Sequence, residues 1–310
     1  MRFMTSLRFI ESVAREKSIR KAAEKLAITS TALNRRILQI EDEIGQPLFE
    51  RLPSGVRLNT AGEIFVQHIR TQTAELARVQ SQISDLSGIR RGHVKIAGGS
   101  ESLQHFLPGV VANYRAEHPA VTFNIIDQSG DEAEASLRKL EVDLAMIFEP
   151  IKTNDFQTIV TAKQKLYCIM AAGHPLTSKK IIKLRDCLDQ VIILPPDSDG
   201  ISQLLKVGMI RRNIDIKPSI ETNSREFLHS YLAKEQVISF QISIAMPTEL
   251  MDSNNVFDGI VAREVDPGDV PTGIMHVGHL KGRVLPVAAA KFLDTIISEL
   301  RVRHGDDLDQ

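Results

Sequence analysis

The chain has 310 residues, 43% hydrophobic and 25% charged, which is more than one small domain needs and typical of a folded, soluble protein. It contains no apolar run near the roughly 18 residues of a membrane helix and no signal-peptide core at its N-terminus, so we expect a cytoplasmic protein with no membrane partner. The net charge of −1 is unevenly distributed. Residues 1–60 carry eleven basic and seven acidic side chains, a net charge of +4, which leaves −5 on the other 250 residues. This asymmetry favours a small phosphate-facing domain attached to a larger one that does not face phosphate.

The two cysteines, Cys168 and Cys187, have no second Cys or His at a zinc-ligand spacing. We interpret them as buried, reduced thiols, and we expect no metal and no cofactor. The chain has no tryptophan and three tyrosines, which leaves little aromatic surface for stacking unpaired bases. RNA and single-stranded DNA are therefore disfavoured as partners.

Three helices are predicted in the first 45 residues. Apolar residues recur at helical spacing over 5–16, and Ser18 can cap a short helix over 20–26. Thr29 and Ser30 offer a cap for a longer helix that ends at Gly45.

The second and third helices, joined by a tight turn, form the helix-turn-helix arrangement that enters a DNA major groove. Residues 48–58 then read as two short strands around a Pro-Ser-Gly turn, which would form a wing. Polar side chains on these elements can bond bases or phosphates of double-stranded DNA, although exposed arginines often only solvate a helix. The candidate DNA contacts are Ser18, Ser30, Thr31, Asn34, Arg35, Arg36, Arg51 and Arg57.

A long helix with a heptad pattern is predicted from about residue 61 to 86. Its seam predicts a homodimer through this helix, and the alternative is a stripe that packs on its own domain. The seam residues are Phe65, Ile69, Leu76, Val79, Ile83 and Leu86. Beyond residue 92, strand-like and helical runs alternate to about residue 301, which predicts an α/β region with mostly parallel sheets in two lobes.

The N-terminal residues resemble the LysR-type transcriptional regulators. The matching positions run in one register over 60 residues and are Phe9, Val13, Ser18, Ala22, Ala23, Leu26, Ser30, Ala32, Ile37, Ile40, Glu41, Ile44, Gly45, Leu48, Phe49, Arg51, Leu58, Ala61 and Gly62. Looser matches, such as Leu107-Pro108 and Gly173-His174-Pro175, extend the likeness to about residue 301. Asn34, Arg36 and Asn59 depart from the usual pattern, so the family's operator sequences do not transfer.

The resemblance implies a winged helix-turn-helix over 1–60, a linker and dimerisation helix with a hinge over 61–91, and a two-lobed effector domain like the periplasmic binding proteins over 92–301. Lobe I would comprise about 92–161 and 266–301, lobe II about 162–265, and residues 302–310 a tail. It also implies a homodimer or a tetramer.

Polar groups at strand ends are the candidate effector site. Gly99, Ser100 and Ser102 lie where a strand gives way to a helix, whose free amides hold carboxylates readily, although Ser102 could be a simple cap. The family's corresponding Ser/Thr pair touches the effector. Gln128, Ser129, Ser198 and Thr222 occupy similar strand ends. We therefore expect a small anionic metabolite, a carboxylate, between the lobes, and the alternative is a neutral effector.

No enzyme motif is present: the sequence has no Gly-x-Ser-x-Gly elbow, P-loop, His-Glu-x-x-His or dinucleotide fingerprint. A transporter's solute-binding protein would share the two lobes but not the first 60 residues. The remaining alternative is a cytoplasmic small-molecule-binding module without sequence-specific DNA regulation.

Overall fold

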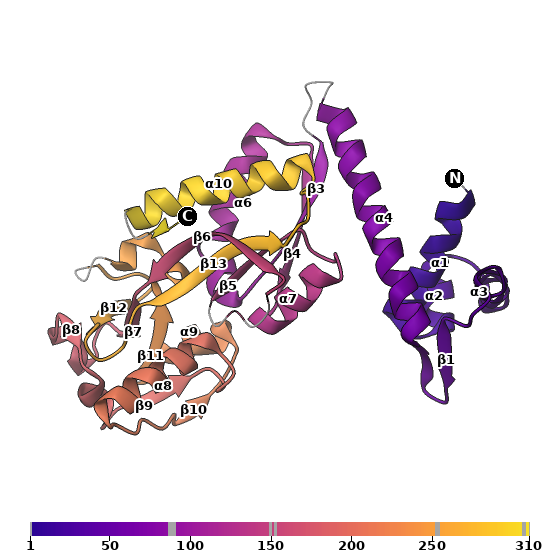
Figure 1. Cartoon of the computed structure of the whole chain (residues 1–310). Helices are drawn as coiled ribbons and strands as arrows, with labels where there is room; N and C mark the ends of the chain where they lie inside the picture. The colour runs from indigo at the N-terminus through magenta and orange to yellow at the C-terminus, as the bar shows by residue number, and fades with distance from the viewer. Residues whose placement is uncertain are drawn as a thin grey trace. The chain divides into compact units, whose positions relative to one another are not determined.

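The computed structural model describes residues 2–85, 91–148, 151, 154–251, 255–305 and 308–309. The chain divides into two compact units, Met1–Gln80 and Ser81–Gln310, and Figure 1 shows both. Leu86, the last residue of the predicted seam, lies outside the described residues. Among the described helices, none combines the length and the apolar character needed to cross a membrane.

The N-terminal unit is a three-helix bundle with a hairpin. It contains α1 (Arg2–Glu16), α2 (Ile19–Lys25), α3 (Ser30–Ile44), β1 (Phe49–Leu52), β2 (Gly55–Leu58) and the start of α4 (Thr60–Asp85). Ser18 Oγ accepts from Lys21 N at 3.4 Å and Thr29 Oγ1 from Ala32 N at 3.2 Å, so both predicted caps form. The third helix ends at Gly45, whose φ of 78° suits glycine.

The core of this unit joins all of its helices. Leu7, Ile10 and Val13 of α1 pack with Leu33 and Ile37 of α3. The same cluster contains Val66 and Ile69 of α4, so the first turns of the long helix belong to the N-terminal unit.

The hairpin is fastened to the helices at two places. Val56 N donates to Lys17 O at 3.0 Å, and a Cβ on Gly55, whose φ is 141°, would collide with that carbonyl. At the other end, the Glu41 carboxylate accepts from Leu48 N at 2.7 Å and from Phe49 N at 3.2 Å. The wing therefore has a fixed position relative to α3.

In the C-terminal unit, lobe I is built on a six-stranded sheet in the order β14-β6-β13-β5-β3-β4. Its strands are β3 (Gly92–Gly98), β4 (Val121–Asp127), β5 (Leu144–Phe148), β6 (Phe156–Gln164), β13 (Gly273–Leu280) and β14 (Leu308–Asp309). Alternate residues of β5 enter different clusters: Leu144 packs with α6 (Leu107–Glu117) and α10 (Val287–His304), whereas Ala145 packs with α7 (Gly130–Arg138). Helices therefore cover both faces (Figure 1).

Lobe II has a second six-stranded sheet in the order β10-β9-β11-β7-β12-β8. Its elements are β7 (Leu166–Ala171), β8 (Ile181–Ile182), β9 (Val191–Leu194), α8 (Gly200–Arg212), β10 (Ile220–Glu221), α9 (Arg225–Leu232), β11 (Val237–Ile242) and β12 (Ile260–Val265). Short 3₁₀ turns at Pro175–Ser178, Leu184–Cys187, Ser243–Ala245 and Thr248–Met251 complete it.

The expectation of mostly parallel sheets is wrong, because both sheets are mixed. In lobe I, β13 runs antiparallel to β5 and β6, and in lobe II, β7 runs antiparallel to β11 and β12. The cause is the pair of crossings between lobes: β6 continues into β7, and β12 continues into β13, with no helix between the strands. A crossover helix is what keeps successive strands parallel.

The last residues are also part of the fold. Residues 302–304 continue α10, and Leu308 and Asp309 pair with Ala162 and Thr161 of β6. The expected tail over 302–310 is therefore contradicted where it is described, because this segment supplies a helix end and an edge strand.

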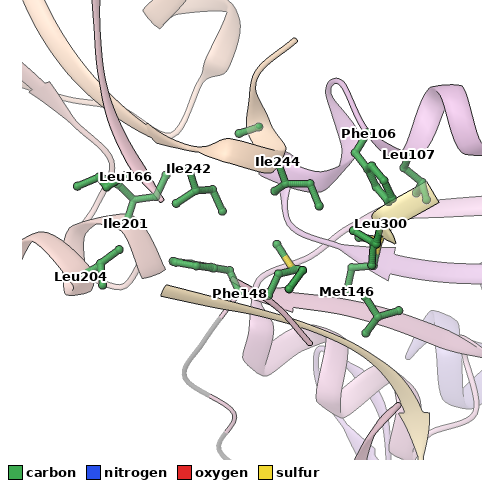
Figure 2. Packing of buried hydrophobic residues seen from close by; sticks show 14 of the residues in the cluster. Phe106, Leu107, Met146, Phe148, Leu166, Ile201, Leu204, Ile242, Ile244 and Leu300 are labelled. Carbon is green, nitrogen blue, oxygen red and sulfur yellow. The ribbon is translucent and has the colours of Figure 1, made fainter. Parts of the chain in front are cut away.

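One hydrophobic cluster runs through both lobes. Figure 2 shows members from Ile201 and Leu204 of α8 to Phe106 and Leu107 at the start of α6, with Met146 and Phe148 of β5 among them. Cys168 and Cys187 are free and buried in the same cluster, as the sequence predicts, and burial raises the pKa of the Cys168 thiol.

Candidate DNA-binding face and effector cleft

Helix α3 has one buried and one polar face. Leu33, Ile37 and Ile40 are buried, whereas Ser30, Thr31, Arg35 and Arg36 are exposed. Because the buried positions recur at i, i+4 and i+7, the remaining positions of the first turns face solvent. A helix that presents hydroxyls and guanidinium groups in this way can bond base edges and phosphates.

Four of the predicted DNA contacts, Ser18, Asn34, Arg51 and Arg57, already have protein partners. Arg51 Nη2 of the wing donates to Asn34 Oδ1 at 2.9 Å, which links β1 to α3. Arg57 Nη2 donates to Glu50 Oε2 at 2.6 Å, and this carboxylate raises the pKa of the guanidinium. The Ser18 hydroxyl is half-buried and caps α2, so its oxygen already serves the fold.

The predicted seam of α4 divides into two parts. Ile69 is 1% exposed inside the core of the N-terminal unit, and Phe65 packs partly against that core. These two side chains follow the alternative that the sequence left open, a stripe packed on its own domain. Leu76, Val79 and Ile83 are 40%, 36% and 62% exposed, so only this second part can meet another chain.

A cavity of about 440 Å³ lies between the two lobes. Lobe I lines it with residues from the start of α5 (Ser100–Leu103), from the β4–α7 turn and from β5, and lobe II lines it with residues around the start of α8. Its walls include five of the predicted effector residues: Gly99, Ser100, Gln128, Ser129 and Ser198. Strand ends from both lobes therefore meet in one cleft.

Two predicted effector residues lie elsewhere. Ser102 is fully buried and donates to Gly99 O at 2.9 Å, so this hydroxyl belongs to the turn and does not line the cleft. Thr222 lines a smaller adjoining cavity of about 60 Å³ together with Ser100 and Arg225, and its Oγ1 accepts from Ser224 N at 3.1 Å.

Arg225 was not predicted from the sequence. Its side chain, from lobe II, contacts Ser100 of lobe I and so links the two lobes. Its Nε donates to Ser100 Oγ at 3.1 Å and its Nη2 lies 3.9 Å from Glu101 Oε2. Both charged side chains are largely buried. Burial raises the pKa of the Glu101 carboxyl, while its own backbone amide and Arg225 lower it. No local motif marks Arg225, because its partners lie about 125 residues away.

A second contact between the lobes lies near this one. Gln104 Nε2, just after α5, faces His229 Nε2 of α9 at 3.1 Å. In this orientation the amide nitrogen donates and the ring nitrogen accepts. Burial, followed by Arg225, lowers the pKa of His229. Within the described part of the chain, no three His, Cys, Asp or Glu side chains gather to hold a metal.

A winged helix-turn-helix joined to a two-lobed unit with an interlobe cleft defines the class of ligand-responsive DNA-binding regulators. Residues 4–63 match the family model of the bacterial regulatory helix-turn-helix protein, lysR family, and residues 87–301 match the LysR substrate binding domain. The chain therefore belongs to the LysR family of DNA-binding transcriptional regulators, and it is a regulator rather than an enzyme.

Relatives and solved structures agree with this assignment. The RuBisCO operon transcriptional regulator of Allochromatium vinosum is 24% identical over 305 residues, 97% of each chain. CbbR of Sinorhizobium medicae is 32% identical over 173 residues, 56% of this chain and 55% of its own. A full-length OxyR variant from Pseudomonas aeruginosa has a TM-score of 0.68 at 21% identity, covering 97% of this chain and 95% of its own. CbnR complexed with its target DNA has a TM-score of 0.64 at 15% identity, covering 96% and 99%.

Proposed function

We propose that this regulator reads its operator with α3 and that a small molecule in the interlobe cleft modulates its grip on DNA. Residues 1–60 form the DNA-binding part, 61–91 the link, and 92–301 the effector-binding part. The observation that carries the effector proposal is the 440 Å³ cleft, whose walls come from both lobes. A ligand that contacts two lobes at once favours one arrangement of them over another, and this difference is what regulation needs.

The contacts proposed for DNA are those that α3 leaves exposed: Ser30, Thr31, Arg35 and Arg36. Arg51 and Arg57 of the wing are placed for phosphates or a minor groove. The apolar side chains of α4 that remain exposed, Leu76, Val79 and Ile83, support a homodimer, which would read an operator with two half-sites. Dimers of this kind can pair further into tetramers. The protein would act where the chromosome is, in the cytoplasm.

An anionic effector, the class expected from the sequence, is supported at one place only. Ser100 lies at the start of α5, and Arg225 provides the nearby cation. That guanidinium already contacts Ser100 Oγ and lies 3.9 Å from a Glu101 carboxylate oxygen, so an incoming carboxylate would have to compete with Glu101.

The test of DNA regulation is a footprint of the full-length protein on the DNA that flanks its own gene, at several salt concentrations. We expect protection of a defined site whose affinity falls steeply with salt, because phosphate contacts release counterions. Equal affinity for unrelated DNA would favour the alternative, a small-molecule-binding module without sequence-specific regulation.

The test of the effector site is a thermal-shift screen on the full-length protein, repeated with Ser100→Ala. Ligands that use the α5 end of the cleft should raise the melting temperature of the wild type more than that of the variant. Hits with equal shifts in both proteins would place the ligand away from Ser100.

A further inference from the structure

The effector cleft is strongly acidic. Glu101, Asp127, Asp131 and Glu132 line it from lobe I, and Asp199 lines it from lobe II. None of the described lining residues is Lys, Arg or His. Arg225, the nearby cation, lies in the wall of the smaller adjoining cavity.

At least three of these five carboxylates already have hydrogen-bond or ion-pair partners within the protein. Both the backbone N and the hydroxyl of Ser129 donate to Glu132 Oε2 at 2.9 Å, and Glu101 faces Arg225. Asp199 Oδ1 accepts from Ile201 N at 2.8 Å as the N-cap of α8. Asp127 pairs through its backbone at the end of β4, and among the described residues its carboxylate has neither a hydrogen bond nor an ion pair.

Three carboxylates of the cleft, those of Glu101, Asp127 and Asp199, interact unfavourably with one another. Burial raises the pKa of Asp127 and of Asp199, and Arg225 lowers both. Asp199 and Asp127 each also raise the pKa of Glu101. Three carboxylates from two lobes thus share one guanidinium. The same wall contains Gln128, whose Oε1 is a buried acceptor without a donor partner among the described residues.

We propose that the cleft binds a small organic cation, an amine or a guanidinium compound, whose charged group lies between Asp127 of lobe I and Asp199 of lobe II. This proposal rests on the proposed function, because it names the ligand class of the same cleft. The N–H groups of such a ligand would supply the donors that the carboxylates and Gln128 Oε1 lack.

The shape of the cleft favours an organic cation over a metal ion. Its walls include the apolar side chains of Met146, Phe148 and Ile201, which suit a short carbon chain. A volume of about 440 Å³ suits a small metabolite. The described His, Cys, Asp and Glu side chains, in contrast, form no group that could hold a metal.

The position of the two aspartates also explains how such a ligand would act on the lobes. Without a cation, the carboxylates of the two lobes repel one another, since Asp199 of lobe II and Asp127 of lobe I both raise the pKa of Glu101. A bound ammonium or guanidinium group converts this repulsion into attraction to both lobes. The ligand therefore favours the closed arrangement by its differential affinity for it.

The test uses the full-length protein and four probes: 1,4-diaminobutane, agmatine, the neutral 1,4-butanediol and the dianion succinate. All probes are added at matched ionic strength, and binding is followed by thermal shift and titration calorimetry. We expect at least one of the two amines to raise the melting temperature and to bind, while the diol and succinate have no effect.

Asp127→Asn and Asp199→Asn should each weaken amine binding by about tenfold or more, because each removes a charge-assisted hydrogen bond. Asn still caps a helix, so Asp199→Asn keeps α8 in place. Asp197→Asn is the matched control, because Asp197 pairs with Lys206 at 2.8 Å and does not line the cleft. This control should bind amines as the wild type does.

The proposal is overturned if neither amine outperforms the diol, if succinate binds instead, or if the Asp127 and Asp199 variants bind amines as tightly as the control. Operator affinity is measured on the same preparations without ligand. A protein that binds its operator but ignores amines refutes only the ligand class, whereas one that binds neither refutes the proposed function as well.

Discussion

The arginines of the DNA-binding unit fall into two pairs with different surroundings. Arg35 and Arg36 extend from α3 into solvent, whereas Arg51 and Arg57 of the wing are held by Asn34 and Glu50. Arg51 already donates an N–H to an amide oxygen and Arg57 to a carboxylate, which leaves each with fewer donors and less freedom to reach a base. The first pair is therefore better suited to read bases, and the second to position the wing.

We expect Arg35→Ala to weaken specific operator binding by about 1 to 3 kcal/mol, the usual value of a bidentate contact to a base. Folding should be unaffected, because the side chain is exposed. The measurement is operator affinity at fixed salt, with Arg211→Ala as control, since Arg211 is exposed on α8 outside the DNA-binding unit. Equal affinities for both variants would remove Arg35 from the interface.

Gly55 should not tolerate a side chain. A methyl group there would meet Lys17 O, and the φ of 141° is strained for any L side chain. We expect Gly55→Ala to destabilise the N-terminal unit by on the order of 2 kcal/mol. Gly109→Ala is the matched control: it lies within α6 with open space around it, so alanine should be neutral or stabilising by about 0.5 to 1 kcal/mol. Equal unfolding free energies of the two variants would contradict the expected collision.

Side chains with local partners were predictable from the sequence. Ser18 and Thr29 cap the helices that follow them, because a cap needs only an amide three residues on. Asn59, a departure from the family pattern, serves the same purpose: its Oδ1 accepts from Gly62 N at 2.8 Å at the start of α4. Ser102 was misjudged because a hydroxyl at a helix start can turn to its own backbone as readily as to a ligand.

The heptad pattern of α4 produces one apolar stripe, and the two halves of this stripe have different surroundings. The sequence predicts the helix and its apolar stripe, but spacing alone does not show what each part of the stripe contacts. The structure buries Ile69 in the unit's own core and leaves Leu76 and Ile83 exposed. The N-terminal part of the stripe therefore packs the helix on its own domain, and the C-terminal part is free to contact a partner chain.

We expect Leu76→Glu to break the dimer while the monomer stays folded, because Leu76 is 40% exposed in the single chain. Burying the carboxylate between two helices would cost about 3 to 5 kcal/mol. The measurement is sedimentation of the full-length protein, and operator affinity should fall in parallel. Thr71→Glu, an exposed position about 140° around the helix from Leu76, is the control. Sedimentation of Leu76→Glu as the wild-type oligomer would show that the helix does not form the interface.

The direction of the strands was harder to predict from the sequence than their position. The sequence indicates the strands and the helices between them, and it suggests a mostly parallel arrangement. It does not show that β6 runs directly into β7 of the other lobe, because β6 mixes polar and apolar residues and does not stand out as a strand beside the apolar run of β7. These crossings reverse the strand direction and make both sheets mixed.

At the scale of the whole molecule, the cleft joins groups that are distant in the sequence. Strand ends predicted part of both walls, since Gly99, Ser100, Gln128 and Ser129 follow strands of lobe I and Ser198 follows β9 of lobe II. Arg225 and the acidic character of the lining were not predictable, because they depend on how the two lobes face each other. The negative charge of this cleft arises because acidic residues from separate segments come together in the fold, and no single sequence motif contains them.

We expect the two-lobed unit to be sensitive to acid, because several of its histidines, His229 at the Gln104 contact among them, have lowered pKa values. Burial, followed by Arg225, lowers the pKa of His229, and burial, followed by His229 and Arg303, lowers the pKa of the neighbouring His105. A histidine with a lowered pKa takes up its proton in the unfolded chain first. The free energy of unfolding should therefore fall as the pH drops below about 6.5, the ordinary value of histidine. Burial also lowers the pKa values of His174 and His276, which contribute in the same direction.

We expect His229→Gln to make this loss of stability shallower, because glutamine can still accept from Gln104 and takes up no proton. Protonated His229 would instead direct an N–H toward Gln104 Nε2, so the present hydrogen bond would be lost and the amide would have to turn its oxygen to the ring. The measurement is the free energy of unfolding of the full-length protein at several pH values between 7.5 and 5.5. His68→Gln, which replaces an exposed histidine of α4, should keep the wild-type slope. If His229→Gln keeps that slope too, the contact between the lobes does not titrate, and their association does not depend on the charge of this ring.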